Sequence, residues 1–320
     1  MISKKPEPTL PHDVLRILKE ENLILIKYLE NGTRSDILKV RYRKEASPLF
    51  LKIAKNEKGS LLLSNQYVWT KQITQLIPPD ANFDIIRPVN TGVIDSKTWI
   101  LSEFVSGTPL AKLNNEFVAI FQVDQPQKYL EPIADMILFI EKSEAIGLRG
   151  IDYQIGKEHK TNKNTLLEEA VRMSSPAVPF LSELLKIISA NYKDLGKTSN
   201  HGDITPINII ILKNNKVILT DADLANILTF KYYDLAEFYN RLYTSALRPD
   251  LATQFLKIIM EKLNKQEVDK FLHNFLCLSS LRAIANFHEL TNIPIEKQTK
   301  RIDAATKYAS LVVSKKIIDI

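Results

Sequence analysis

Three oxygen-bearing side chains lie close together in the sequence, between residues 203 and 221. Asn208 lies five residues after Asp203, and Asp221 lies thirteen residues after Asn208. Amide and carboxylate oxygens are the ligands that Mg²⁺ prefers in proteins, and a further carboxylate can accept the proton of a hydroxyl group. The segment therefore indicates metal-assisted phosphoryl transfer, with Asp203 as the catalytic base and with Asn208 and Asp221 as the metal ligands.

A β-hairpin is predicted to bring these side chains together. Apolar runs flank Asn214 and Asn215, and asparagine tolerates the left-handed backbone that a tight turn demands. If these two residues form the whole loop, residues whose numbers sum to 429 face each other. Asn208 is then expected opposite Asp221, with their Cβ atoms about 4.5–5.5 Å apart.

The rest of the chain divides into a strand-rich part and a helix-rich part. Alternating apolar residues predict strands at 23–29, 37–42 and 49–54, a helix at about 59–77, and two further strands near 85–93 and 98–105. Beyond residue 109, amphipathic helices are expected to the end of the chain, interrupted only at 200–223. We therefore expect an α+β, bilobal fold: a small antiparallel-sheet lobe over residues 1–104, with a flexible tail at 1–12, and a larger, mostly helical lobe over residues 105–320.

The catalytic segment resembles the aminoglycoside phosphotransferase and choline kinase superfamily, which has a protein-kinase-like fold. His201-Gly202-Asp203 and Asn208 match the pattern of that superfamily at each fixed place, and Asp221 matches its metal-binding aspartate. The usual Asp-aromatic-Glu triplet is replaced by Asp221-Ala222-Asp223, and the role of Asp223 stays open between metal, substrate and solvent. Tyr233-Asp234-Leu235-Ala236 resembles a helix start whose aspartate is structural.

The resemblance extends to the small lobe and implies a nucleotide site. Lys52 corresponds to the lysine that binds the phosphates, and Gly32 and Thr33 lie in the segment that corresponds to the nucleotide-covering loop. Ser102, Glu103 and Phe104 correspond to the hinge, whose backbone would bind adenine. The resemblance thus implies ATP and Mg²⁺ as cofactors, and transfer of the γ-phosphate to a hydroxyl group of a small molecule.

Two features leave alternatives open. The helix after Lys52 carries Gln66 or Asn65 where the family has a glutamate that pairs with the lysine, so a degenerate kinase that only binds a nucleotide or a partner is the second hypothesis. His201 is expected to orient the loop rather than to act as the base. A protein kinase is disfavoured because neither Asp-Phe-Gly nor Ala-Pro-Glu occurs in the sequence.

Composition limits the partners and the compartment. The 320 residues include 43 Lys and Arg against 37 Asp and Glu, and no run of like charges concentrates them, which disfavours a nucleic-acid partner. A single cysteine, Cys277, excludes an internal disulfide. No membrane-spanning run or leader-like segment is found, so a cytoplasmic protein without a membrane partner is expected. These features say nothing of the oligomeric state.

The acceptor is the least determined part of the prediction. Residues 236–320 contain 9 acidic and 13 basic residues, which disfavours a polycationic aminoglycoside. A choline-like cation would need an aromatic cage. The aromatic residues available for one are Tyr239, Tyr243, Phe271, Phe275 and Phe287. A neutral or anionic hydroxylated metabolite fits the sequence at least as well.

Overall fold

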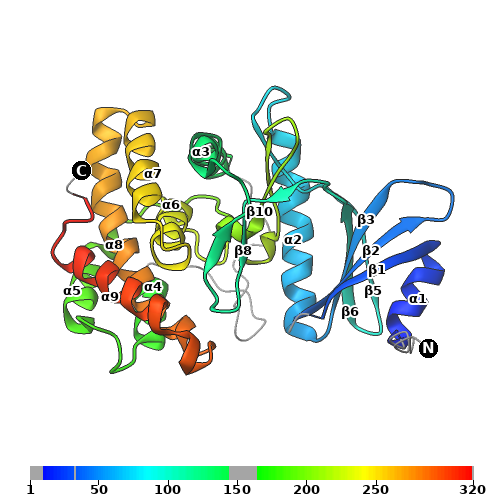
Figure 1. Cartoon of the computed structure of the whole chain (residues 1–320), viewed down its shortest axis with the longest axis horizontal. Coiled ribbons are helices and arrows are strands. Elements are labelled where there is room, and N and C mark those ends of the chain that lie inside the picture. Colours follow the sequence, from blue (N-terminus) through cyan, green and yellow to red (C-terminus); the bar gives the residue numbers. More distant parts are fainter. Residues whose placement is uncertain (1–9, 32–33, 144–163, 319–320) are drawn as a thin grey trace.

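The computed structural model describes residues 10–31, 34–143 and 164–318. They form a small lobe built on a sheet and a larger lobe built mainly of helices, which lie side by side (Figure 1). The predicted α+β, bilobal architecture is thereby confirmed. The predicted boundary at residues 104 and 105 lies just after the last strand of the small lobe, which ends at Glu103.

The small lobe is a five-stranded antiparallel sheet with two helices packed on it. Its strands run in the order β1-β2-β3-β6-β5. Helix α1 packs on β1, and α2 packs on β3 and β6. The elements are α1 (His12–Glu20), β1 (Leu23–Asn31), β2 (Ser35–Tyr42), β3 (Pro48–Ala54), α2 (Glu57–Leu76), β5 (Pro88–Ile94) and β6 (Lys97–Glu103). Of the predicted tail, residues 1–9 lie outside the described residues, and α1 begins at His12.

Strand alternation positions Lys52. In β3, Leu51 and Ile53 are buried in the core of the small lobe, where they belong to the same cluster as Leu38 and Trp99. Side chains of successive strand residues point to opposite faces of a sheet, so Lys52 lies on the face turned away from this core. That face borders the large lobe.

Three short segments depart from the sequence-based expectation. Strand β4 (Phe83–Ile85) pairs in parallel with β11 (Val217–Leu219), in a second sheet of order β4-β11-β10-β7, so Ile85 does not join the small lobe's sheet. This sheet also contains β7 (Thr108–Pro109) and β10 (Ile209–Ile211). The hairpin of β8 (Ala111–Leu113) and β9 (Ala119–Phe121) stands where helices were predicted. Strands of two or three residues are too short to show an alternating pattern.

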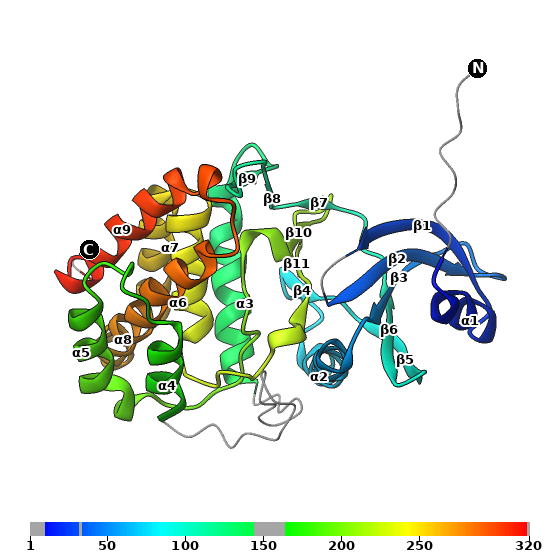
Figure 2. The same ribbon diagram turned by 90° about the horizontal axis from the view of Figure 1, so that it is seen from below.

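The large lobe packs its helices around a central core. Helix α3 lies between the second sheet and the other helices of this lobe (Figure 2). The longer elements are α3 (Leu130–Lys142), α4 (Asn164–Met173), α5 (Leu181–Asn191), α6 (Tyr233–Asn240), α7 (Pro249–Lys262), α8 (Lys265–Leu290) and α9 (Thr299–Val313). The short helical turns are η1 (Pro126–Tyr129), η2 (Tyr192–Asp194), η3 (Pro206–Asn208), η4 (Ala222–Leu224), the π-helical η5 (Arg241–Ser245) and η6 (Ile295–Lys297).

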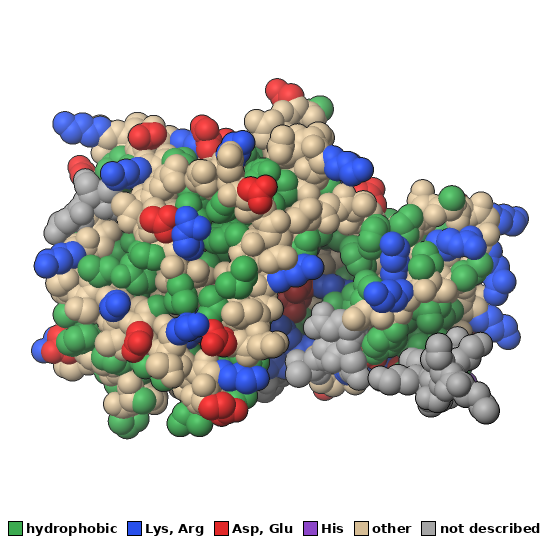
Figure 3. Space-filling model, viewed as in Figure 1, with side chains coloured by type: hydrophobic (Ala, Val, Ile, Leu, Met, Phe, Trp, Pro, Cys, Tyr) green, Lys and Arg blue, Asp and Glu red, His purple; other side chains and the backbone are tan. Residues whose placement is uncertain are grey.

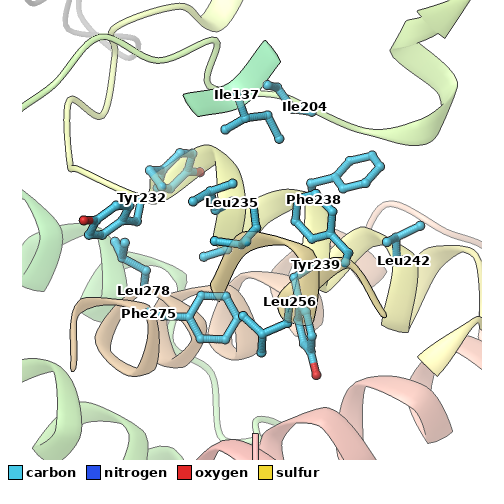
Figure 4. Close-up of a cluster of buried hydrophobic side chains, with 14 of the residues drawn as sticks. Ile137, Ile204, Tyr232, Leu235, Phe238, Tyr239, Leu242, Leu256, Phe275 and Leu278 are labelled. Atoms are coloured by element: carbon cyan, nitrogen blue, oxygen red, sulfur yellow. The ribbon is translucent and has the colours of Figure 1, made fainter. Parts of the chain in front are cut away.

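The core reaches the segment that carries Asp203. Ile204, directly after Asp203, is fully buried and belongs to the same cluster as Leu235 and Phe238 of α6 (Figure 4). Burial of a side chain of this size contributes about 1.5–3 kcal/mol to stability. The loop of Asp203 is therefore anchored in the core. Within the described ranges, none of the helices combines the length and the apolar character needed to cross a membrane.

Candidate active site

The predicted hairpin is present, but its register differs by one residue. Ile209 pairs with Leu219 and Ile211 with Val217, so facing residues sum to 428 rather than 429. The reason is a three-residue loop, 213–215, in which Asn215 alone has the left-handed backbone, with φ of 64°. Asn208 consequently lies opposite Thr220, whose N–H donates to the Asn208 carbonyl over 2.9 Å. The prediction that Asn208 faces Asp221 directly was wrong.

Asp221 nevertheless reaches the cleft, because its own backbone turns there. Asp221, two residues after the end of β11, has φ of 64°, in the left-handed region. The strand alternation ends at this residue. As a result, Asn208, Thr220 and Asp221 line the same pocket, together with Lys52.

The loop around Asp203 is held by buried groups on both sides. Asp234 accepts hydrogen bonds from the backbone N–H groups of His201 (2.6 Å) and Gly202 (2.9 Å), so it braces the loop as the resemblance implied. Gly202 has φ of 81°, and a Cβ atom there would stand 2.3 Å from the Leu224 carbonyl oxygen. Only glycine fits this position.

His201 orients the loop and does not act as a base. Its side chain is fully buried, and burial lowers its pKa to about 4, so the ring is neutral at pH 7. Its Nε2 lies 3.0 Å from the carbonyl oxygen of Thr220, which can only accept, so Nε2 carries the proton. The ring also packs edge-on against Trp69. His201 therefore ties the loop to the end of β11.

Asp203 and Asn208 are in direct contact. The Nδ2 of Asn208 donates to the Asp203 backbone carbonyl over 3.0 Å and to its carboxylate Oδ2 over 3.1 Å. The amide oxygen Oδ1 of Asn208 takes no part in these two bonds and is the atom that could bind a cation. The contact fixes the distance between the proposed base and the proposed metal ligand.

Lys52 lies between an acid of the large lobe and an amide of α2. Its Nζ forms an ion pair with Asp221 and lies 3.4 Å from the Oε1 of Gln66. Gln66 thus occupies the place of the expected glutamate, while Asn65 does not contact Lys52 in this way. Instead, the Nδ2 of Asn65 donates to the carbonyl oxygens of Asp223 (3.2 Å) and Ala225 (2.8 Å). Two neighbouring amides of α2 therefore contact the two lobes: Gln66 contacts Lys52 in the small lobe, and Asn65 binds the backbone around Asp223 in the large lobe.

A second ion pair crosses the cleft, and sequence reasoning did not foresee it. The Nη1 of Arg34, directly before β2, lies 3.1 Å from the Oδ2 of Asp223. Gly32 and Thr33, predicted to cover the nucleotide, lie outside the described residues. Asp223 is thus paired with the small lobe through Arg34.

The cleft contains a small, mostly apolar pocket at the predicted hinge. The pocket has a volume of about 170 Å³ and is lined by Ile37, Phe50, Lys52, Gln66, Ile86, Ser102, Asn208, Ile210, Thr220 and Asp221. Figure 3 shows the hollow between the lobes, with acidic and basic side chains inside it. Of the hinge residues, Ser102 lines the pocket, Phe104 packs on Phe50, and the Glu103 side chain is exposed. The Glu103 N–H donates to the Arg87 carbonyl, so it is not offered to a ligand.

Burial and neighbouring charges separate the pKa values of the three aspartates. Burial raises the pKa of Asp203 to about 7, although the Arg241 guanidinium opposes this. Burial also raises the pKa of Asp223, with the Asp221 carboxylate adding to the effect, to about 6. For Asp221, burial is outweighed by the Lys52 ammonium, and its pKa lies below the usual range. Asp221 is therefore the anion, and Asp203 is poised to exchange a proton near neutral pH.

The donor set suits Mg²⁺ only when a phosphate completes it. No three His, Cys, Asp or Glu side chains gather into a metal cluster within the described ranges. Mg²⁺ is commonly bound by one or two protein oxygens plus waters and substrate phosphates. The ionised Asp221 and the Oδ1 of Asn208, lining one pocket, fit that pattern.

The proposed aromatic cage is not available as a set. Tyr239, Phe271 and Phe275 are buried in the core of the large lobe. Tyr239 and Phe275 pack against each other with ring centroids 5.3 Å apart. Three of the five candidate residues therefore belong to the core, and a choline-like acceptor loses its main support.

The chain has the fold of the aminoglycoside phosphotransferases, a protein-kinase-like fold. A thermostable mutant of aminoglycoside phosphotransferase APH(4)-Ia, in ternary complex with ADP and hygromycin B, is similar with a TM-score of 0.63 and 12% identity, over 95% of this chain and 98% of that chain. Another mutant, with AMP-PNP and hygromycin B, has a TM-score of 0.64 at 14% identity and the same coverage. A further structure of APH(4)-Ia has a TM-score of 0.62 at 14% identity, over 94% of this chain and 97% of that chain.

These similarities confirm the predicted superfamily resemblance through the fold. No protein-family model and no curated protein sequence matches this chain. The similarity at 12–14% identity therefore shows the fold alone, and the reaction has to be argued from the side chains themselves.

Proposed function

We propose that this protein is a Mg²⁺-dependent phosphotransferase that moves the γ-phosphate of ATP to a hydroxyl group of a small molecule. One observation carries the proposal. Lys52 of the small lobe and Asn208 and Asp221 of the large lobe line one pocket, and Asp203 is hydrogen-bonded to Asn208. Phosphoryl transfer requires positioning and charge stabilisation more than covalent chemistry, and this set supplies both.

The nucleotide would bind with its adenine at the hinge and its phosphates at Lys52. The apolar side chains of Ile37, Phe50 and Ile210 in the pocket lining suit a flat base, and Ser102 of the hinge lines the same pocket. The Nζ of Lys52 would exchange part of its contact with Asp221 for phosphate oxygens while Gln66 keeps it in place. The complexes of the structurally similar APH(4)-Ia with ADP and with AMP-PNP support a nucleotide as the ligand of this fold.

The metal would be held by Asp221 and Asn208. A bound Mg²⁺ neutralises phosphate charge and orients the leaving group. Asp221 stays ionised because the Lys52 ammonium lowers its pKa, so it is ready to bind a cation. Asn208 can contribute its Oδ1 while its Nδ2 holds Asp203.

Asp203 would accept the proton of the acceptor hydroxyl. Its pKa of about 7 makes it a stronger base than an exposed aspartate while leaving much of it ionised at neutral pH. Asn208 and the Asp234-braced backbone restrict its position. Asp203 thus has both the basicity and the fixed geometry of a general base.

One observation favours the second hypothesis, a degenerate kinase. Gln66 replaces the carboxylate that would pair with Lys52, and Lys52 is instead paired with Asp221, a proposed metal ligand. If Asp221 stays bound to Lys52, a nucleotide could bind without turnover.

A screen with two measurements separates these functions. Melting temperature is measured with ATP, with and without Mg²⁺, and ATP-dependent phosphate transfer is measured over aminoglycosides, choline-type alcohols, sugars and fructosamines. Asp203→Asn is expected to lower turnover by about 10²–10⁴-fold while nucleotide binding persists. Asp250→Asn, which changes an exposed carboxylate paired with Arg248, is the control that should leave turnover unchanged.

Each outcome decides one point. Nucleotide binding without transfer to any acceptor would favour the degenerate kinase. The absence of any nucleotide-dependent shift in melting temperature would reject both hypotheses. Turnover that survives Asp203→Asn would remove Asp203 as the base.

A further inference from the structure

A network of five charged side chains lies next to the loop of Asp203, with Glu237 and Arg282 buried and Glu289 30% exposed. Glu237 of α6 forms ion pairs with Arg241 over 2.6 Å and with Arg282 of α8 over 2.5 Å. Glu289, also in α8, accepts hydrogen bonds from the Nη2 of both Arg241 (2.9 Å) and Arg282 (2.8 Å). Arg301 of α9 approaches Glu289 only to 4.0 Å. Sequence reasoning assigned a function to none of these residues.

The network holds more positive than negative charge. Three arginines share two glutamates, and each glutamate already contacts Arg241 and Arg282. Leaving a buried charge uncompensated is costly, so the excess positive charge calls for an anion. Besides the two glutamates, the carboxylate that acts on the Arg241 guanidinium is that of Asp203, which raises the pKa of Arg241. Asp203, however, is the group proposed to handle the acceptor proton.

Arg301 is the least compensated member of the network. Its side chain is only 10% exposed, and its Nη2 donates to the hydroxyl of Ser245 over 3.2 Å. Its buried Nε has no hydrogen-bond partner among the described residues. Burial lowers its pKa, and the neighbouring Arg241 and Arg282 lower it further. A guanidinium in this position has donor capacity that the described part of the chain does not use.

The β8–β9 hairpin connects the network to the loop of Asp203. Arg241 begins the π-helical segment η5, and π-helical segments are frequent at functional sites. The β8–β9 hairpin packs on Ala246, just after η5, and contacts η3 of the catalytic loop. Phe117, in the same hairpin, packs against the corner between α8 and α9. The hairpin therefore contacts the catalytic loop, the segment that follows Arg241 and the corner between α8 and α9.

We propose that Arg301, supported by Arg241 and Arg282, binds an anionic group of the acceptor, a carboxylate or a phosphate, and so selects hydroxylated anions as substrates. This inference rests on the proposed function, and it names the acceptor class. Arginine suits this role because its planar, always-charged fork can bind carboxylate or phosphate with two parallel hydrogen bonds. The acceptor's negative charge balances the network, and its hydroxyl is directed to Asp203.

Matched acceptor pairs test the selection. Transfer is measured for hydroxy acids against their amides, and for sugar phosphates against the parent sugars, in the wild type, Arg301→Gln and Arg301→Lys. We expect the charged member of at least one pair to have a kcat/KM at least tenfold higher. Arg301→Gln should abolish that preference mainly through KM, and Arg301→Lys should restore part of it. Arg172→Gln, which removes an exposed arginine of α4, is the control.

The kinetic outcomes are distinct. Equal kcat/KM for the charged and neutral members would overturn the inference while leaving the phosphotransferase function intact. A preference that persists in Arg301→Gln would also overturn it. A preference for hydroxy acids alone would identify the anion as a carboxylate, and one for sugar phosphates alone as a phosphate.

A measurement of anion binding tests the proposed site at Arg301 independently of the proposed phosphotransferase activity. Melting temperature is recorded with inorganic phosphate or acetate, with sodium chloride at matched ionic strength as the reference. One of the two anions should stabilise the wild type and Lys52→Gln, but not Arg301→Gln. If no acceptor is phosphorylated and this pattern still appears, the proposed function fails and the anion site stands. The opposite pattern is that the anion still stabilises Arg301→Gln but no longer stabilises Lys52→Gln. That pattern would place the anion at Lys52 and overturn the inference. No stabilisation by either anion would overturn it too.

Should Arg301→Gln fail to fold, Arg301→Lys keeps both tests decisive. It retains the buried positive charge and removes the planar fork. We expect it to weaken anion stabilisation and the kinetic preference at least threefold. Unchanged values in a folded Arg301→Lys would count against a role for this guanidinium.

Discussion

The ion pairs on the two sides of Asp203 are built differently. On the nucleotide side, each base faces one acid, with Lys52 on Asp221 and Arg34 on Asp223. These pairs join the two lobes, and the Asp221 side chain is 41% exposed. On the side of the arginine network, three arginines share two glutamates within one lobe. Its centre is buried, with Glu237 and Arg282 1% and 7% exposed, while Glu289 is 30% exposed.

This difference indicates that the ion pairs on the nucleotide side can be replaced by contacts with a ligand, whereas the arginine network has to stay intact. A partly exposed pair is worth little and can be replaced by a phosphate and a cation. A buried network cannot open without leaving charges uncompensated. We infer that the nucleotide side rearranges when ligand binds, whereas the acceptor side is preformed. The following predictions test that contrast.

The largest effect is expected on stability, from Glu237→Gln. Removing one partner of a buried ion pair costs about 3–5 kcal/mol, because the arginines are left without their counter-charge. The free energy of unfolding, measured by urea denaturation, should fall by that amount. Asp250→Asn breaks an exposed pair in the same lobe and should cost less than about 1 kcal/mol. Equal losses in the two variants would refute the contrast.

Next in size is the loss of nucleotide affinity in Lys52→Gln. A hydrogen bond to a charged group contributes about 1.5–3 kcal/mol, which corresponds to roughly a 10- to 100-fold higher Kd for ATP by calorimetry. The melting temperature without ligand should change little, since the Lys52–Asp221 pair is exchangeable. Lys55→Gln, which removes a lysine paired with Asp36 one residue beyond β3, is the matched control. An unchanged Kd in Lys52→Gln would remove Lys52 from the phosphate site.

The pH dependence tests Asp203 itself. Its pKa is about 7 in the folded chain against an ordinary 3.8, so between these values the folded state keeps a proton that the unfolded state has lost. The contribution of Asp203 to the free energy of unfolding should therefore fall as pH rises through this window, by at most about 1.4 kcal/mol for each pH unit. Turnover should rise over the upper part of the same window, because the base must be ionised.

Asp203→Asn provides the comparison for that profile. The variant should lose turnover and part of the stability slope, while the part due to Asp234, whose pKa burial also raises to about 7, remains. An identical slope in wild type and variant would show that Asp203 does not titrate in this range.

The smallest effect is expected from Gln66→Glu. A carboxylate in place of the amide would hold Lys52 more strongly and loosen its pair with Asp221. Because Gln66 is only 4% exposed, the new ion pair would be buried, and the cost of desolvating the carboxylate offsets much of its attraction to Lys52. We therefore expect kcat/KM for ATP to rise by about fivefold at most, which corresponds to roughly 1 kcal/mol. Gln72→Glu, at another position of α2, is the control. A fall of tenfold or more would show that the amide is required.

Much of the site could be predicted from the sequence because it is local. Asp203, Asn208 and Asp221 lie within 19 residues and one hairpin, so short-range geometry determines where they meet. The sheet containing Lys52 follows from alternation over several long strands. The error in register arose because Asn214 and Asn215 suit a two-residue turn as well as the observed three-residue loop. A loop that is one residue longer changes the partner of every residue in the hairpin.

Only the tertiary structure decided which residues from distant parts of the chain surround the segment from Asp203 to Asp221. Asp223 meets Arg34 across 189 positions of the chain, and Gln66 rather than Asn65 reaches Lys52 because of how α2 is rotated against β3 and η4. The arginine network joins α6, α8 and α9, whose contacts depend on the packing of long helices rather than on any spacing in the sequence. The residues themselves determined that this chain could position a phosphate, a metal and a base. Helix packing decided which charges lie beside the loop of Asp203.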